Sequence, residues 1–349
     1  YDPGLLKLTG IDRKKLPKIL LSTSVLGNLK EDIAEQFGLD PSTKVVVSSP
    51  DIQTAAVGSG AVKDYQAHLC LGTSSWLTCH VPYKKTDLLN NIATLPSALP
   101  KRYFVANEQE SAGICLSHLQ KLFSGFLTNQ KTSSKEQFLI VERLAEQSPP
   151  GSRKLIYTPW LNGERTPVED HTIRGGFHNL SLSHNSSDIC RSVYEGVAFN
   201  SRWLLDTVET FTKKSIGDIN IIGGGADSAL WCQVHADILE KNINQVDAAR
   251  HANARGAAWL AALALGYTDL DAIANSKSIK RVFKPQQQFQ KNYRNQYREF
   301  LNLYKANRKI SKRLQSIKDL ELIEPETASK KALLNTDSLV DNRSSTHNF

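Results

Sequence analysis

The feature that most constrains the fold is a strand-like run followed at once by a glycine turn and a helix. Ile219–Ile222 is short and continuously apolar, residues 223–226 read Gly-Gly-Gly-Ala, and Leu230, Val234 and Ile238 then recur on one face of a predicted helix. This order presents backbone N–H groups to a phosphate, or lets the chain pass close beneath a flat ring. A glycine triplet alone is also common in ordinary turns, so the flanking strand and helix carry the prediction.

A second constraint is a predicted β-hairpin with a polar tip. The β-like runs Ala67–Leu71 and Ser75–Val81 flank Gly72, Thr73 and Ser74. Backbone N–H and hydroxyl groups at this tip are candidate donors to the β- and γ-phosphates of a nucleotide. The same residue types favour a plain turn, so the motif is weak by itself. The sequence also lacks the Gly-x4-Gly-Lys-[Ser/Thr] pattern of P-loop nucleotide hydrolases.

Asp51 stands just beyond a third predicted strand, residues 44–48. An Asp that follows Pro at a strand end is usually a turn residue or a helix cap. Here, however, a run rich in small residues follows at 54–61 and predicts a helix whose backbone closely approaches another segment. A second helix of this kind is predicted at 255–266. Together with the Gly-Thr-Ser hairpin, this context favours a catalytic carboxylate.

Five segments of the sequence occur in a fixed order: Asp51 with its small-residue run at 51–60, the hairpin tip at 71–74, Pro-Trp-Leu-Asn-Gly-Glu-Arg-Thr-Pro at 159–167, the stretch 175–195 and the glycine turn at 223–228. In order and approximate spacing they resemble the FGGY family of carbohydrate kinases, and its xylulokinase-like members in particular, as that family's aspartate segment, phosphate hairpin, Pro-Tyr-Leu-x-Gly-Glu-Arg-x-Pro segment, second signature and adenine-side loop. Two positions depart from the family pattern, because Asn179 replaces a usual Gly and Ser-Ser-Pro at 48–50 replaces a glycine-rich segment.

The resemblance implies an α/β fold, the actin-like or ribonuclease-H-like ATPase architecture, with one complete nucleotide-binding domain and a remnant of the first domain. We expect the remnant of the sugar-binding domain, with the catalytic Asp, at 1–64 and the nucleotide-binding domain at 65–308. The polar composition of 309–349 predicts a disordered tail. The family's first phosphate strand, its metal-side carboxylate and most of its sugar contacts have no counterpart here, so we expect the chain to represent about the second half of a kinase.

The resemblance also implies roles for individual residues. Asp51 would be the base that accepts the proton of a sugar hydroxyl, with ATP as phosphoryl donor and Mg²⁺ bridging its phosphates. The implied acceptor is a sugar or polyol, with a ketopentose such as D-xylulose first. The residues themselves leave two interpretations of Glu164 and Arg165 open, a structural ion pair that braces the cleft or a contact with a ligand. The implied nucleotide-binding residues are Gly72, Thr73, Ser74, Gly224, Gly225 and Ala226.

Charge, cysteine content and hydropathy argue against several other classes of protein. The formal net charge of +8 is concentrated near the C-terminus, and the basic stretch 305–318 lacks interleaved aromatic residues, so nucleic acid is not an expected partner. No run approaches the roughly 20 apolar residues of a membrane span. Five widely spaced cysteines indicate reduced thiols and a cytoplasmic protein. His171, His178 and His184 fit no common metal-site spacing, so no protein metal site is expected.

Three functions remain open at the level of sequence. The chain could be an active kinase, or a non-catalytic ATP-binding half that associates with a separate first-domain chain or with a second copy of itself. It could also be an inert fragment with an exposed apolar face where a lost domain packed. The first two predict ATP binding, and only the first predicts sugar-dependent release of ADP.

Overall fold

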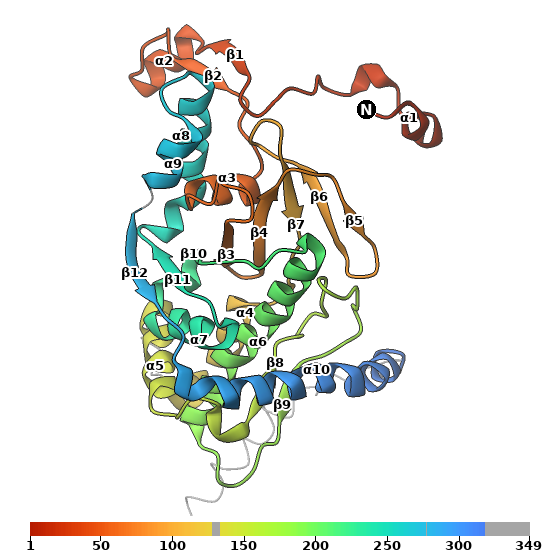
Figure 1. The fold of residues 1–349 in the computed structure, drawn as a ribbon, viewed down its shortest axis with the longest axis vertical. Helices are drawn as coiled ribbons and strands as arrows, with labels where there is room; N and C mark the ends of the chain where they lie inside the picture. Colours follow the sequence, from red (N-terminus) through yellow and green to blue (C-terminus); the bar gives the residue numbers. More distant parts are fainter. Residues whose placement is uncertain (128–132, 277, 318–349) are drawn as a thin grey trace, which may run out of the picture.

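The computed structural model describes residues 1–127, 133–276 and 278–317. Within these residues, eight strands form one mixed sheet in the order β12-β11-β10-β3-β4-β7-β6-β5 (Figure 1). β10 runs parallel to β3 and β11, and the other neighbouring strands are antiparallel. The strands are β3 (Ala67–Leu71), β4 (Ser75–Val81), β5 (Thr86–Asp87), β6 (Ile92–Pro96), β7 (Tyr103–Ala106), β10 (Ile219–Ile222), β11 (Ile243–Val246) and β12 (Ile279–Phe283). The hairpin and the strand before the glycine turn therefore have the bounds that the sequence predicts.

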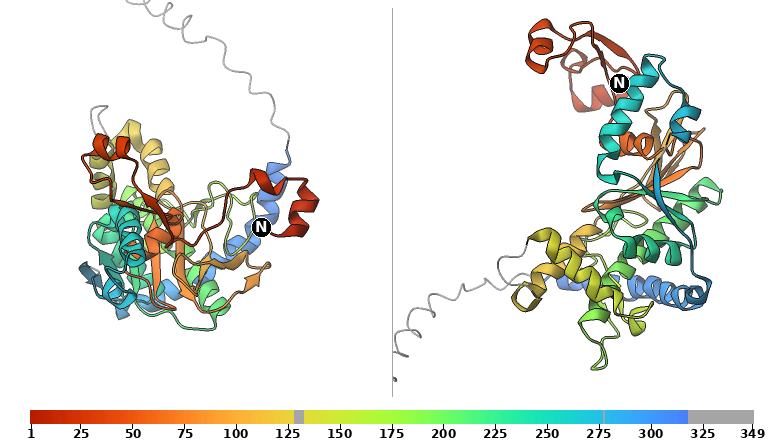
Figure 2. Two further views of the ribbon diagram at one scale, coloured as in Figure 1. Left: turned by 90° about the horizontal axis from the view of Figure 1, so that it is seen from above. Right: turned by 90° about the vertical axis from the view of Figure 1, so that its left-hand side faces the viewer.

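Helices cover both faces of this sheet (Figures 1 and 2). One face carries α4 (Gly113–Leu127), α5 (Ser134–Glu146), α6 (Ser186–Thr212), α7 (Ala229–Leu239) and α10 (Gln287–Gln315), and the other carries α3 (Asp51–Gly58), α8 (Ala252–Ala264) and α9 (Leu270–Asn275). A small antiparallel hairpin, β8 (Ile156–Thr158) with β9 (Gly176–His178), packs against α6. Among the described helices, none is both long enough and apolar enough to cross a membrane.

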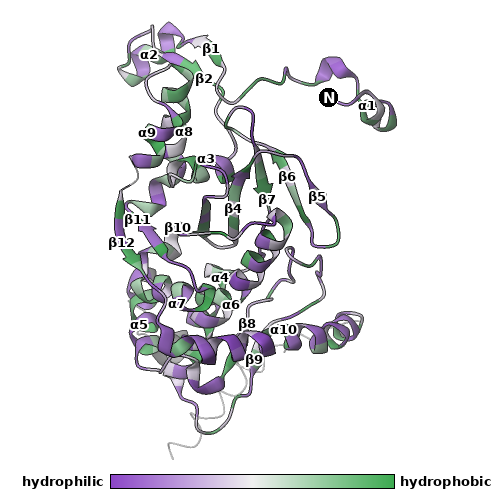
Figure 3. Cartoon of the chain, viewed as in Figure 1, coloured by the Kyte–Doolittle hydropathy of each residue, from purple (hydrophilic) through white to green (hydrophobic). Residues whose placement is uncertain are grey.

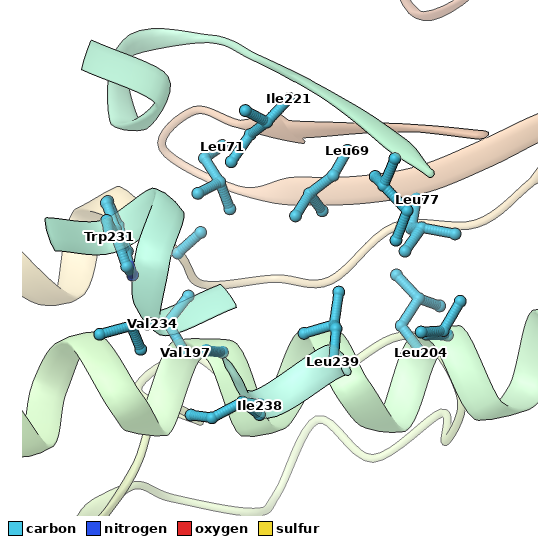
Figure 4. Packing of buried hydrophobic residues seen from close by; sticks show 14 of the residues in the cluster. Leu69, Leu71, Leu77, Val197, Leu204, Ile221, Trp231, Val234, Ile238 and Leu239 are labelled. Carbon is cyan, nitrogen blue, oxygen red and sulfur yellow. The ribbon is translucent and has the colours of Figure 1, made fainter. Parts of the chain in front are cut away.

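The main core lies between the sheet and the helices α6 and α7. Leu69 and Leu77 of the β3–β4 hairpin point toward Val197 and Leu204 of α6 (Figure 4). α6 begins at a capping box. The Asn185 side chain accepts the N–H groups of Ser187 and Asp188, and the Asp188 side chain accepts the N–H of Asn185. The sequence predicts this helix with its cap at Ser187, two residues late. Hydropathy differs between the core and the periphery, since the inner strands are apolar and α10 is largely polar (Figure 3).

Helices α3 and α8 cross at two glycines, as their small-residue sequences predict. A Cβ atom on Gly58 would lie 1.8 Å from the carbonyl oxygen of Ala252, and one on Gly256 would lie 1.8 Å from that of Thr54. Both separations are far below any real carbon–oxygen contact, so only glycine permits this approach. The crossing holds α3, and therefore Asp51 at its first residue, against the rest of the fold.

The N-terminal region forms an arm that extends away from the sheet (Figures 1 and 2). It contains α1 (Pro3–Thr9), the antiparallel pair β1 (Val25–Asn28) and β2 (Lys44–Val46), and α2 (Glu31–Phe37). α2 ends at Gly38, as the sequence predicts. Many apolar side chains are exposed on this arm, with Leu8 83% and Phe37 68% exposed. An exposed apolar surface of this extent is typical of an interaction face.

Two segments differ from the sequence-based expectations. The helix predicted at 106–126 begins only at Gly113, because Tyr103–Ala106 forms strand β7. The tail predicted to be disordered from residue 309 is wrong at its start, because α10 continues to Gln315 and Ser311 is buried on the same side as Tyr304. Residues 318–349 of that predicted tail lie outside the described residues.

Candidate nucleotide site and catalytic carboxylate

The tip of the β3–β4 hairpin is fixed by the segment that opens α4. The N–H groups of Gly113 and Ala112 donate to the carbonyl oxygens of Gly72 and Thr73, both at 2.9 Å. Gly113 permits this contact because its Cβ would lie 2.5 Å from the Gly72 oxygen. In the described part of the chain, the N–H groups of Thr73 and Ser74 have no protein acceptor. The tip therefore offers two backbone donors to a ligand, while its carbonyls are already bonded.

The glycine turn passes directly across the end of β3. Gly223 has a φ of +87°, and a Cβ there would lie 2.5 Å from the carbonyl oxygen of Leu71. A Cβ on Gly225 would lie 2.7 Å from the Leu71 Cβ and 2.8 Å from the Trp231 ring. Ser228 then caps α7 by accepting the N–H of Trp231 at 3.0 Å. The turn thus places bare backbone beside the end of β3.

These two turns face one cavity of about 720 Å³. Four of the six predicted nucleotide-binding residues line it, namely Gly72, Thr73, Gly224 and Gly225. Its other walls include Gly113 and Ile114 of α4, Phe138, Leu139 and Glu142 of α5, Asp227, Trp231 and Arg250.

The other two predicted residues, Ser74 and Ala226, are not among those that line the cavity. The hydroxyl of Ser74 donates to Glu108 at 3.1 Å. Ala226 is fully buried, and its carbonyl oxygen accepts from the Gln245 side chain at 2.6 Å. The Ser74 hydroxyl and the Ala226 carbonyl therefore hold the turns in place, whereas the backbone N–H of Ser74 has no protein acceptor among the described residues.

Sequence reasoning missed the wall that α5 supplies. The hydroxyl of Ser228 donates to Glu142 at 2.5 Å, which joins α5 to the glycine turn. A usable signal was present, because Ser133 and Glu136 form a capping box of the Ser-x-x-Glu type that marks the start of α5. The ion pair between Arg250 and Asp227, at 2.6 Å in the wall of the cavity, had no such signal because the two residues are far apart in sequence.

Asp51 lies outside this cavity, as the first residue of α3, and its carboxylate is exposed. It accepts the N–H of Ile52 at 2.8 Å. Burial raises the pKa of the Cys70 thiol to about 12, and the negative charge of Asp51 adds to this rise. Cys70 lies two residues before the hairpin tip. The exposed Asp51 carboxylate at the start of α3 is therefore open to a ligand.

The ion pair between Glu164 and Arg165 that the sequence leaves open is not formed. Glu164 is buried and accepts from the Asn200 side chain at 2.6 Å and from two backbone N–H groups. Burial raises its pKa to about 7. Arg165 instead contacts Glu108 and Glu110, each at 2.5 Å. The ion pair does not form because the Glu164 side chain points into the core, whereas the partly exposed Arg165 side chain contacts Glu108 and Glu110.

Comparison with known proteins gives a consistent result. The C-terminal domain of the FGGY family of carbohydrate kinases matches residues 67–265, and the N-terminal domain of the same family matches residues 1–58. A xylulose kinase of Staphylococcus epidermidis is 29% identical over 308 residues, which are 86% of this chain and 59% of that protein. A gluconokinase of Bacillus subtilis is 26% identical over 307 residues, 87% of this chain and 59% of the relative.

Solved structures show the same likeness. A ligand-bound xylulose kinase from Lactobacillus acidophilus superposes with a TM-score of 0.79 at 26% identity, covering 90% of this chain and 62% of that one. A xylulose kinase from Brucella ovis gives 0.78 at 27% identity, covering 89% and 62%. The actin-like α/β fold expected from the sequence is thereby confirmed. The chain spans about three fifths of the length of the relatives it matches.

Proposed function

The chain belongs to the FGGY family of carbohydrate kinases, and on this premise we propose that it transfers the γ-phosphoryl group of ATP to a hydroxyl group of a sugar or polyol. The observation that carries the proposal is the shared cavity into which the hairpin tip and the glycine turn both open. Phosphoryl transfer depends mainly on positioning and charge stabilisation, so convergent backbone donors beside an apolar wall are the parts it requires.

Within this cavity, we place the phosphates of ATP at the hairpin tip and the base toward the glycine turn. Thr73 and Ser74 would donate their N–H groups to the phosphates, with Gly72 providing close approach. Gly224 and Gly225 would lie beneath the base, while Ala226 anchors their turn to β11 through Gln245. The apolar walls of Phe138 and Trp231 suit the flat faces of a purine.

Asp51 is proposed as the general base. An exposed carboxylate at the start of α3 can accept the proton of the attacking hydroxyl as the γ-phosphoryl group departs from ADP. Mg²⁺ would enter with ATP on its phosphates. The carboxylates of Glu108 and Glu110, beside the tip, are already engaged by Arg165, so the metal would be held chiefly by the nucleotide on this side.

The acceptor is proposed to be a ketopentose, with D-xylulose first. Three of the similar proteins are named as xylulose kinases and one as a gluconokinase. A sugar acid is therefore the second candidate.

We divide the chain into a first-domain segment at 1–64 and a nucleotide-binding domain that begins at residue 65. The two family matches support this division, because one ends at residue 58 and the other begins at residue 67. Five free, buried thiols support a reducing compartment such as the cytoplasm.

A second candidate is an ATP-binding half that turns over only with a separate first-domain chain. The exposed apolar side chains of the N-terminal arm favour it, because they offer a surface for such a partner or for a second copy. This candidate shares the nucleotide site and differs only in needing the partner for sugar-dependent turnover.

The test is ADP release from MgATP with a panel of ketopentoses, polyols and sugar acids. Asp51→Asn should lower sugar-stimulated turnover by a factor of about 10²–10⁴, the usual range for general-base assistance, and leave ATP binding within about twofold. Asp218→Asn, at an exposed aspartate that accepts from the Asn242 side chain, is the matched control. ATP binding without turnover by the unaltered chain would favour the second candidate, and no ATP binding would refute both.

A further inference from the structure

The segment 107–112 runs beside the start of β4 and determines where two acidic side chains lie. Gln109 pairs with Ser75 through both backbone hydrogen bonds, at 2.8 and 3.2 Å. The fully buried Gln109 side chain also donates to the carbonyl of Asn200 in α6 at 2.7 Å. Glu108 and Glu110 flank this anchored residue, so both carboxylates are held on the opposite side of the segment, near Arg165.

Arg165 and Glu108 connect the core to the hairpin tip. The guanidinium contacts Glu108 Oε2 at 2.5 Å, while Glu108 Oε1 accepts the Ser74 hydroxyl at 3.1 Å. The two oxygens of one carboxylate are thus divided between Arg165 and the tip. The Nε atom of Arg165 contacts Glu110 at 2.5 Å. Ser74 is therefore oriented by an ion pair that does not itself line the cavity.

The base of this network is rigid. The N–H groups of Glu110 and Arg165 both donate to Glu164 Oε1 at 2.9 Å, and Asn200 donates to Glu164 Oε2 at 2.6 Å. Glu164 is 1% exposed. The backbone of Arg165 is thereby fixed to α6, and its side chain reaches outward from a fixed point to the two carboxylates.

The charges in this network matter because the proposed ligand is an anion. Glu108 and Glu110 have side chains 39% and 24% exposed. Without a cation, these two negative charges beside the tip would repel the phosphates of a nucleotide. Burial alone would lower the pKa of Arg165, but the two carboxylates raise it, so the cation persists at all ordinary pH values. Arg165 therefore offsets both carboxylates while Glu108 holds Ser74.

We propose that Arg165 and Glu108 are positioning residues for the phosphate end of the nucleotide site: Glu108 orients the hairpin tip through Ser74, and Arg165 both holds Glu108 and cancels its charge. The inference rests on the proposed function, since it deepens the account of the same site. It assigns the Arg of the Gly-Glu-Arg-Thr-Pro segment a role toward the phosphates, although that residue does not touch them.

The test compares dissociation constants of ATP and of adenosine, measured by calorimetry on the full chain. Arg165→Gln should weaken ATP binding about tenfold, the equivalent of one charge-assisted hydrogen bond, and leave adenosine binding unchanged. Glu108→Gln added to Arg165→Gln should restore ATP binding to within about threefold, because the amide oxygen still accepts from Ser74 and the loss of one carboxylate returns the cluster to the net charge that it has in the unaltered chain. Arg165→Lys, which keeps the charge, should lose less than about threefold.

Arg294→Gln is the matched control, because Arg294 is a surface arginine paired with Glu240 and is not among the residues that line the cavity. It should bind both ligands normally. Equal losses for ATP and adenosine in Arg165→Gln, or no recovery in the double variant, would overturn the inference and indicate a purely structural role. An unaltered chain that binds neither ligand would instead refute the proposed function, and the inference with it.

Discussion

Replacing Gly256 by alanine tests whether the α3–α8 crossing positions α3, the helix that carries the proposed base Asp51. The added Cβ would lie 1.8 Å from the carbonyl oxygen of Thr54, whereas real Cβ atoms stay beyond 3.0 Å, so the helices must separate by at least 3.0 − 1.8 = 1.2 Å. Overpacking of this kind costs about 1–3 kcal/mol. Alanine recovers about 1 kcal/mol of helix propensity. Because the required shift is large, we take the upper end and expect a net loss of about 2 kcal/mol.

The assay is urea unfolding of the unaltered chain and of two variants. Gly256→Ala should lower the midpoint without changing the slope, and should also reduce sugar-stimulated turnover because α3 carries Asp51. Gly217→Ala is the control, since nothing lies within 4 Å of the position that a Cβ would occupy there and its backbone is unstrained. A Gly256→Ala chain as stable as the unaltered one, or more stable, would refute the close crossing.

Two further expectations concern Glu164 and Gly225. Burial raises the pKa of Glu164 from 4.5 to about 7. The contribution of the protonated side chain to stability is therefore complete below about pH 4.5 and is lost as the pH rises through 7. Across that window, the free energy of unfolding should fall by on the order of 3 kcal/mol relative to the Glu164→Gln variant. Parallel pH profiles of the two chains in urea titrations would contradict this. Gly225→Ala should weaken ATP binding at least about tenfold by forcing the turn away from Leu71 and Trp231, and calorimetric binding equal to that of the unaltered chain would show that the turn adapts.

Local patterns predicted the strands and turns of the candidate site, because each of these elements is formed by consecutive residues. The hairpin strands and the strand before the glycine turn were predicted to the residue, because β-like runs and glycines mark those boundaries directly. The small-residue runs at 54–61 and 255–266 predicted close helix approach, but not that each helix is the partner of the other. That pairing depends on tertiary contacts that no single segment contains.

The hydrogen-bond and ion-pair partners of individual side chains could not be predicted from local sequence patterns. Ser74 looked like a phosphate ligand because of its place in the tip, yet its hydroxyl bonds to Glu108, 34 residues along the chain. Arg165 looked like the partner of its neighbour, but its distance from Glu108 is set by the pairing of Gln109 with Ser75. α10 was hidden by its polar composition, although the buried Tyr293, Phe300 and Tyr304 recur at helical spacing.

The most direct test of the nucleotide site is hydrogen exchange of the chain with and without MgATP, followed by mass spectrometry of its peptides. Bound ATP should slow exchange in peptides covering the hairpin tip at 72–74 and the glycine turn at 223–226, because both present N–H groups to the cavity. Peptides from 292–302 of α10 should be unaffected. Protection at α10 with none at the tip or the turn would place the nucleotide elsewhere and contradict the account.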